Sequence, residues 1–270
     1  MTAPIPRDIP DLPVIPGRRT NLMPSSAPAG AVAPPVRRPL VAAYRLLLAL
    51  AALGAATVEI LLGSPPRVLS HFAIQSTLLL AAVTLASARR AWTARRPLPA
   101  ALTGATLVYV VAAALLQHVL LADATPAYTM TGPAGTTGTA DLTGPAGTLA
   151  ALAPPALHTV LPIAAVLDWL LLSPPARMRL AHAAAWLLYP MAYLAFTLAR
   201  ELFLPAGPAR HLYPFQDTDL HGYRYVLGIS LLLLVALYGL ALALIAVDRT
   251  RPDPLRLGAK TGFRLQPPVG

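Results

Sequence analysis

The chain has 270 residues, of which 56% are hydrophobic and only 12% charged, and it carries a formal net charge of +10 with no cysteine. Soluble domains carry about 25% charged residues, so this composition and a mean hydropathy of +0.60 indicate a protein that spans a bilayer several times. The lack of cysteine excludes disulfides and thiolate metal sites. The positive charge does not indicate a nucleic-acid partner, because it is confined to short segments between apolar runs.

Both ends of the chain are predicted to be disordered tails on the cytoplasmic side of the membrane. Residues 1–39 contain ten prolines, which interrupt any continuous helix, and nothing in this segment can form a core. Residues 248–270 follow the last apolar run and hold five arginine or lysine residues. They are also predicted to be disordered.

Six apolar runs lie between the tails, each at least 18 residues long. A helix of that length crosses a hydrocarbon core of roughly 30 Å. The spans are predicted over residues 40–63, 70–88, 98–121, 155–172, 180–204 and 225–247. The expected fold is therefore an all-α bundle of six transmembrane helices within residues 40–247.

Arginine and lysine residues in the connections set the expected orientation, since cytoplasmic connections carry more of them. The two tails with the second and fourth connections hold 16 such residues, whereas the other three connections hold 3. Both termini are therefore predicted to lie in the cytoplasm. Arginine outnumbers lysine by 20 to 1, which is typical of a GC-rich bacterial genome, and in a bacterium the bilayer would be the plasma membrane.

Given this topology, five of the six histidines lie on the extracytoplasmic side. His71 and Gln75 are four residues apart, so they share one face of the second span. His158 begins the fourth span, and Pro162 one turn later lacks the amide proton that would bond the His158 carbonyl. Ionisable side chains in hydrocarbon need a polar partner or have a functional role. We therefore predict that these residues converge around His158.

Other polar residues are interpreted as structural. Asp168, toward the inner end of the fourth span, is expected to pair with Arg177 or Arg179 beyond it. Arg45 is expected to extend its guanidinium to the cytoplasmic interface. Three further histidines are interpreted as interface or loop residues: His118, His211 and His221.

Three segments together resemble a known family. They are His71–Leu78 in the second span, Leu157–Pro162 followed by Asp168 and Trp169 in the fourth, and Tyr213–Asp217 before the sixth. In this order they resemble the bacterial six-span branch of the androgen-induced membrane protein family, over roughly residues 70–247. The animal members of that family are membrane-embedded hydrolases of fatty-acid esters of hydroxy fatty acids, and they use a threonine and a histidine.

The resemblance implies roles for individual residues. His158 matches the family's catalytic histidine, and Tyr213 belongs to its Tyr-Pro-Phe segment. The family's threonine follows the aromatic residue of the second span, and that position is Ala73 in this chain, which has no hydroxyl. A nucleophile would have to come from Thr77, one turn deeper on nearly the same face, or from Ser76.

The implied chemistry needs a base, because a hydroxyl is a weak nucleophile until its proton is removed. His158 would be that base near neutral pH, and His71 or Gln75 would stabilise the oxyanion. The expected partners are the bilayer and a lipid or fatty-acid ester, with no nucleic acid, metal or cofactor. The first hypothesis is therefore an intramembrane lipid-ester hydrolase, active or degenerate.

The alternative is a non-enzymatic protein that binds or transports a small molecule, a proton or a metal ion. Histidines and carboxylates clustered inside a bundle can relay protons or hold a metal. A third hypothesis is a scaffold whose outer polar groups only hold the helices together. The sequence leaves these three hypotheses open.

Overall fold

The computed structural model of the protein describes residues 37–122, 145–175, 177–204 and 210–252. Within these ranges six helical segments are long and apolar enough to cross a bilayer, and there is no strand. The segments run over Pro39–Leu62, Phe72–Trp92, Ala100–Leu120, Gly147–Leu172, Leu180–Phe203 and Thr218–Thr250. The predicted all-α bundle of six spans is confirmed, while the two predicted tails lie almost entirely outside the described residues.

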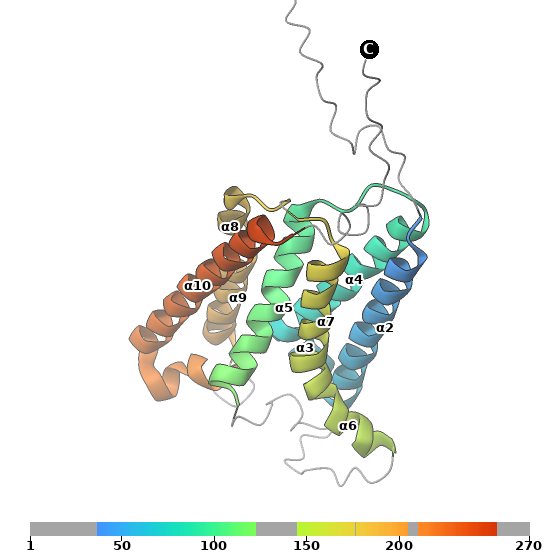
Figure 1. The fold of residues 1–270 in the computed structure, drawn as a ribbon. Coiled ribbons are helices and arrows are strands. Elements are labelled where there is room, and N and C mark those ends of the chain that lie inside the picture. The colour runs from blue at the N-terminus through green and yellow to red at the C-terminus, as the bar shows by residue number, and fades with distance from the viewer. Residues whose placement is uncertain (1–36, 123–144, 176, 205–209, 253–270) are drawn as a thin grey trace, which may run out of the picture. The chain divides into compact units, whose positions relative to one another are not determined.

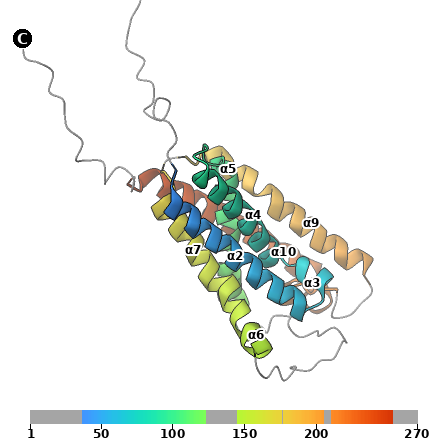
Figure 2. The ribbon, with the colours of Figure 1, turned by 90° about the vertical axis from the view of Figure 1, so that its right-hand side faces the viewer.

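Helix α5 (Ala100–Leu120) lies at the centre of the bundle (Figure 1 and Figure 2), where it contacts α4 (Phe72–Trp92), the fourth span, α8 (Leu180–Trp186) and α10 (Thr218–Thr250). The first three spans are α2 (Pro39–Leu62), α4 (Phe72–Trp92) and α5 (Ala100–Leu120), and α3 (Pro65–Leu69) links the first two. The fourth span comprises α6 (Pro145–Pro155), η1 (Ala156–Val160), α7 (Leu161–Leu167) and η2 (Asp168–Leu172). The last two spans are α8 (Leu180–Trp186) with α9 (Leu188–Phe203), and α10 (Thr218–Thr250), with the short turn η3 (Pro214–Gln216) between them.

The spans alternate in direction, so the bundle has two ends (Figure 1). One end, named the terminal end, is where the described chain begins and ends. There the start of α2 meets the end of α4, and the Arg38 N–H donates to the Ala91 carbonyl at 3.1 Å. The opposite end, named the histidine end, carries His71, His118 and His211. The location of the terminal end in the cytoplasm stays a prediction.

The fourth span is a continuous helix with two widened turns. Its helix passes through Pro154 and Pro155, so the span begins at Gly147, earlier than predicted. The π-helical turn η1 follows, in which the Leu161 N–H donates to the Ala156 carbonyl five residues earlier. The widened turn contains the His158 carbonyl, which Pro162 leaves without an amide donor.

Helix α10 extends beyond the predicted sixth span, 225–247, at both ends. Asp217 caps its start, because its carboxylate accepts hydrogen bonds from two backbone N–H groups of the first turn, each at 2.9 Å. Gly222 kinks the first turns with a φ of +76°, a left-handed conformation that favours glycine. The helix ends at Thr250, so the first residues of the predicted tail 248–270 belong to the bundle.

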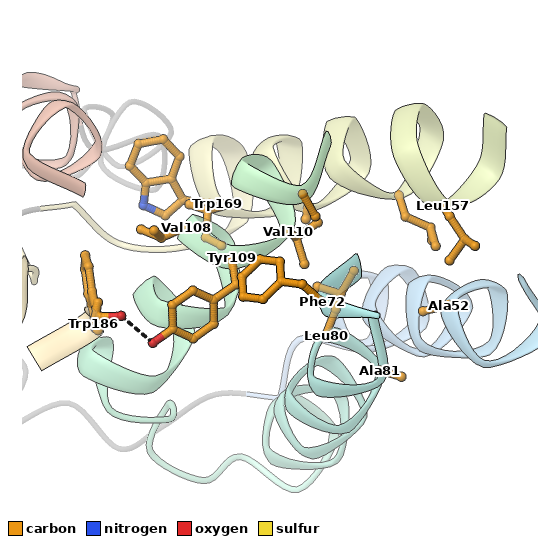
Figure 3. Packing of buried hydrophobic residues seen from close by; sticks show 14 of the residues in the cluster. Ala52, Phe72, Leu80, Ala81, Val108, Tyr109, Val110, Leu157, Trp169 and Trp186 are labelled. Atoms are coloured by element: carbon orange, nitrogen blue, oxygen red, sulfur yellow. Dashed lines mark hydrogen bonds between the residues drawn. The ribbon is translucent and has the colours of Figure 1, made fainter. Parts of the chain in front are cut away.

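An aromatic contact joins α5 to the fifth span inside the core (Figure 3). The Tyr109 hydroxyl donates to the Trp186 carbonyl at 2.8 Å, and the Trp186 Nε1 donates to the Ala101 carbonyl at 2.8 Å. Gly104 permits this approach, because a Cβ atom there would lie 2.5 Å from the Trp186 ring. Phe72 extends the cluster to α4, with its ring centroid 6.1 Å from that of Tyr109.

A buried carboxylate anchors the last helix at the terminal end. Asp248 is 1% exposed and accepts hydrogen bonds from the backbone N–H groups of Arg177 and Met178, each at 2.9 Å. Arg251 pairs with the same carboxylate at 2.9 Å, and its guanidinium lies 4.8 Å from the centre of the Trp169 ring. Asp248 thus has both the hydrogen bonds and the counter-charge that a buried carboxylate needs.

Arg251 also closes the end of the fourth span. Its guanidinium donates to the Trp169 carbonyl and to the carbonyls of Leu170, at 3.0 Å, and Pro174, at 3.1 Å. The last carbonyl groups of a helix have no donor within the helix, and lipid offers none. One side chain of α10 therefore completes the backbone hydrogen bonding of another span.

A second ion pair, partly buried, joins α2 to the fourth span. Arg45 Nε lies 2.8 Å from Asp168 Oδ1, and Arg45 Nη2 donates to the Ser173 hydroxyl at 3.1 Å. The prediction that Asp168 pairs with Arg177 or Arg179 is therefore wrong. The reason is that antiparallel packing of α2 on the fourth span brings the charges of Arg45 and Asp168 level inside the bundle. Arg45 also reaches Ser173, just beyond the end of the fourth span, so its extension toward the cytoplasmic interface stays a prediction.

Replacing Arg251 with alanine is expected to destabilise the protein, because it leaves the Asp248 carboxylate buried without a counter-charge. Removing one partner of a buried pair costs about 3–5 kcal/mol, so the thermal unfolding midpoint in detergent micelles should fall by several degrees. Arg249→Ala is the matched control, since Arg249 is an exposed residue of the same helical turn. Equal midpoints for the two variants would show that the pair does not hold α10.

The predicted orientation can be tested by cysteine labelling, because the chain has no cysteine of its own. Thr93 is exposed at the terminal end and His221 at the histidine end. A membrane-impermeant maleimide is expected to label His221→Cys in intact cells, and Thr93→Cys only after permeabilisation. The reverse pattern would show that the termini lie outside.

Candidate functional site

His158 lies inside the bundle at the histidine end, in the π-helical turn η1. Its side chain is only 5% exposed, and η1 packs against α2, α4 and α5. The imidazole therefore faces other helices and not the lipid, as a chemical role would require. An ionisable ring at this depth needs polar partners.

The backbone of His158 has such a partner on α5. The Nε2 atom of His118 lies 3.2 Å from the His158 carbonyl oxygen and 3.1 Å from the Thr159 hydroxyl. Because a carbonyl only accepts, His118 must carry its proton on Nε2. Pro162 has no amide proton to give to that carbonyl, so an imidazole from the neighbouring helix takes the place of the missing donor.

His71 is the residue immediately before α4, and it is buried. Its Nδ1 donates to the Arg67 carbonyl at 2.8 Å, and its ring packs edge-on against Tyr213 with centroids 5.5 Å apart. Burial lowers the pKa of His71 below its ordinary value; the bond to the Arg67 carbonyl opposes that shift, and the positive charges of Arg67 and Arg200 reinforce it. The His71 ring is therefore neutral at pH 7.

The two candidate hydroxyl groups lie inside the bundle on α4. The Ser76 side chain is 1% exposed, and its Oγ donates to the Phe72 carbonyl one turn earlier at 2.7 Å. Thr77 is 4% exposed, whereas Ala73, the position that matches the family's threonine, is half-buried. In this geometry Ser76 serves the backbone of its own helix, and its hydroxyl must rotate before it can attack a substrate.

Gln75 is also engaged with its surroundings. Its Nε2 donates to the Leu69 carbonyl at 2.9 Å, and its Oε1 accepts a hydrogen bond from the Tyr189 hydroxyl. The amide therefore holds the start of α4 against α3 through Nε2 and against α9 through Oε1. The amide nitrogen carries two N–H groups, so the one that does not bond the Leu69 carbonyl could bond an oxyanion.

Two tyrosines cap the start of α4, of which the sequence predicted only Tyr213. The Phe72 N–H donates to the hydroxyl oxygens of Tyr193, from α9, and Tyr213, each at 3.2 Å, and the Tyr193 hydroxyl donates to the Ser70 carbonyl at 3.0 Å. The first amides of a helix lack partners within it, so these phenols replace the water that a soluble helix would use. Burial raises the pKa of Tyr213 to about 12, which keeps its hydroxyl uncharged.

A cavity of about 120 Å³ lies between α4, α5, α9 and α10. Toward the histidine end it is walled by aromatic rings, those of Phe72, Tyr193, Tyr213 and Phe215. Farther from that end it is walled by leucines of α10, Leu233, Leu234 and Leu237. Tyr213 is thus a predicted site residue that contributes to an apolar cavity inside the bundle.

Two residues of the cavity wall each carry a buried polar atom that has no hydrogen-bond partner among the described residues: Oε1 of Gln216 and Oγ of Ser230. The other end of the Gln216 amide donates to the Thr197 hydroxyl at 3.4 Å. An unpaired buried polar atom costs about 1–3 kcal/mol, so a hydrogen-bond partner for either atom would be favourable. The sequence prediction missed them, although Ser230 is the single hydroxyl residue in the apolar run 226–237.

A separate polar cluster surrounds His211 at the histidine end. The ligand atoms of His211, Asp217 and Asp219 lie within 4.8 Å of one another, a spacing that would suit a metal ion. However, Arg210 already binds Asp219 at 3.2 Å, and His211 Nδ1 lies 3.1 Å from Glu201. A guanidinium beside the acceptors opposes binding of a cation, so this cluster acts as an ion-pair network that holds the segment before α10 against α9.

No family model, curated protein or solved structure matches this chain. The resemblance to the androgen-induced membrane protein family, based on His71–Leu78, Leu157–Pro162 and Tyr213–Asp217 together, therefore stays a prediction. Tyr213 lines the cavity and His158 is buried in η1, both at the histidine end.

Proposed function

We propose that this integral membrane protein binds an amphiphile with a hydrocarbon chain, such as a fatty acid or a lipid ester, inside its helical bundle. The observation that carries the proposal is the polarity of the cavity. Its far wall consists of Leu233, Leu234 and Leu237, whereas the two unpartnered polar atoms belong to Gln216 and Ser230, nearer the histidine end. A ligand with a polar group at the histidine end and an apolar chain beside the leucines would match this arrangement.

The two polar atoms restrict the chemistry of the polar group. The Gln216 oxygen can only accept a hydrogen bond, whereas the Ser230 hydroxyl can donate or accept. A ligand that satisfies both needs a donor and an acceptor close together. A protonated carboxyl group or a hydroxyl group meets that requirement, which favours a fatty acid or a hydroxylated lipid.

The size of the cavity fits a segment of an acyl chain. A helix rises ~1.5 Å per residue, so the stretch from Ser230 to Leu237 covers roughly 10 Å along α10. The volume of about 120 Å³ is close to that of an engineered cavity of roughly 150 Å³ that accepts benzene. The rest of a long chain would therefore extend out of the cavity into the surrounding lipid.

Filling the cavity is expected to abolish binding. The probe is a palmitic acid that carries a photoreactive diazirine, with the protein in lipid nanodiscs. The wild type should give photo-adducts that excess palmitic acid competes away, and Leu234→Trp should lose them because its indole occupies the cavity. Ser230→Ala should raise the concentration of competitor needed about fivefold, since one hydrogen bond of ~1 kcal/mol is lost.

The matched control is Leu232→Trp, which adds the same side chain to the lipid-facing surface of α10, where Leu232 is 61% exposed. This variant should retain the competable adducts. Equal labelling of Leu234→Trp and Leu232→Trp would place the probe on the outer surface of the bundle and overturn the proposal.

Ester hydrolysis is the second candidate function, favoured by the burial of His158 in a turn that packs against the helix of Ser76 and Thr77. In this hypothesis His158 takes the proton as the hydroxyl oxygen attacks the ester carbonyl carbon, and gives it to the leaving alcohol. Water activated by the same base then releases the acid. Gln75 would bond the oxyanion with the second N–H of its amide nitrogen, or His71 would do so with a ring N–H group.

The hydrolase hypothesis predicts turnover of a long-chain fatty-acid ester by the purified protein, lowered about 10²–10⁴-fold in His158→Ala. Ser76→Ala and Thr77→Val separate the candidate nucleophiles, because only loss of the attacking hydroxyl abolishes labelling by a fluorophosphonate probe. His221→Ala changes an exposed histidine and serves as the control. Inactivity of the wild type over a panel of esters, without probe labelling, would remove this hypothesis and leave the binding proposal standing.

A further inference from the structure

One carboxylate inside the spans differs from all other acidic groups of the described ranges. Glu59 lies on α2 three residues before its end, and its side chain is 1% exposed. Neither of its carboxylate oxygens has a hydrogen-bond partner among the described residues. Burying an ionised carboxylate in this way costs several kcal/mol.

The remaining acidic side chains of those ranges all have partners. Asp168 and Asp248 each bind an arginine. The other three acidic residues contact His211 or Arg210 at the histidine end. Each of these carboxylates therefore lies beside an arginine or a histidine, and Glu59 is the exception among the described residues.

The elements packed against α2 near Glu59 carry few titratable groups. These are Arg67 in α3, His71 before α4 and His158 in η1, whereas α6 and α7 carry none. No ion pair within 4.0 Å joins any of them to the Glu59 carboxylate. The other charged groups of these elements lie toward the terminal end, as does Arg45, fourteen residues or roughly 21 Å away along α2.

We propose that Glu59 is a proton-binding site of the bundle, held as a neutral carboxylic acid at neutral pH and exchanging its proton from the histidine end. A buried acid without a counter-charge takes up a proton because the neutral form loses much less hydration energy than the ionised form. Three residues separate Glu59 from the end of α2, about 5 Å along the helix axis, so the path to solution is short. An ionisable group inside a membrane bundle is a site for function by default, and this site is independent of the amphiphile cavity.

Dicyclohexylcarbodiimide tests the proposal, because it is apolar and reacts with protonated carboxyl groups. The acid proton moves to one nitrogen of the reagent as the carboxyl oxygen bonds its central carbon, and the adduct rearranges to a stable N-acylurea without another reactant. With the protein in nanodiscs at pH 7, peptide mass mapping is expected to find the adduct on Glu59 and not on Asp168 or Asp248. The reaction should slow as the pH is raised.

Two variants control the assignment. Glu59→Gln keeps the size of the side chain and should lose the adduct, whereas Asp168→Asn should retain it. Infrared difference spectra of the wild type against Glu59→Gln give a readout that does not depend on access of the reagent. The carbonyl stretch of a protonated acid supports the proposal even where the adduct is absent, and a carboxylate band in its place overturns it whatever the labelling shows.

Discussion

The position of the last helix depends on the buried pair between Asp248 and Arg251. The carboxylate bonds two amides of the connection between the fourth and fifth spans, and the guanidinium bonds the carbonyls that end the fourth span. Lipid offers no replacement for any of these bonds, so a shift of α10 along its axis would leave several groups unpaired at once. The cavity depends on that register, because α10 supplies its leucine wall.

The same constraint explains much of the polarity at the histidine end. There, two phenols bond the first amide of α4, and His118 bonds the carbonyl that Pro162 leaves without a donor. Some of the polar side chains that converge there thus serve to complete the hydrogen bonding of the backbone. Among the described residues, the groups without such a backbone role include the unpartnered atoms of Gln216 and Ser230 and the carboxylate of Glu59.

The number of spans and the fold class were predictable because they depend on the length and hydropathy of local segments. The pairing of Arg45 with Asp168 was not, since it depends on the register of two antiparallel helices that lie 123 residues apart in sequence. The helix through Pro154 and Pro155 was missed because local preference treats proline as a stop, whereas a helix inside a membrane bundle can continue through proline. The cavity has no local signal at all, because its walls come from four helices.

The orientation of His158 depends on how many residues stand between it and the straight part of the fourth span. A π-helical turn is an α-helical turn with one residue inserted. The extra residue is accommodated within one full turn, so the helix on either side of η1 keeps its facing. Deleting a single residue between His158 and Leu161 would close the turn to α-helical geometry and change chiefly the residues within it. A one-residue gap at this turn would therefore act locally, on the imidazole of His158 and its carbonyl, and would leave the two halves of the fourth span in place.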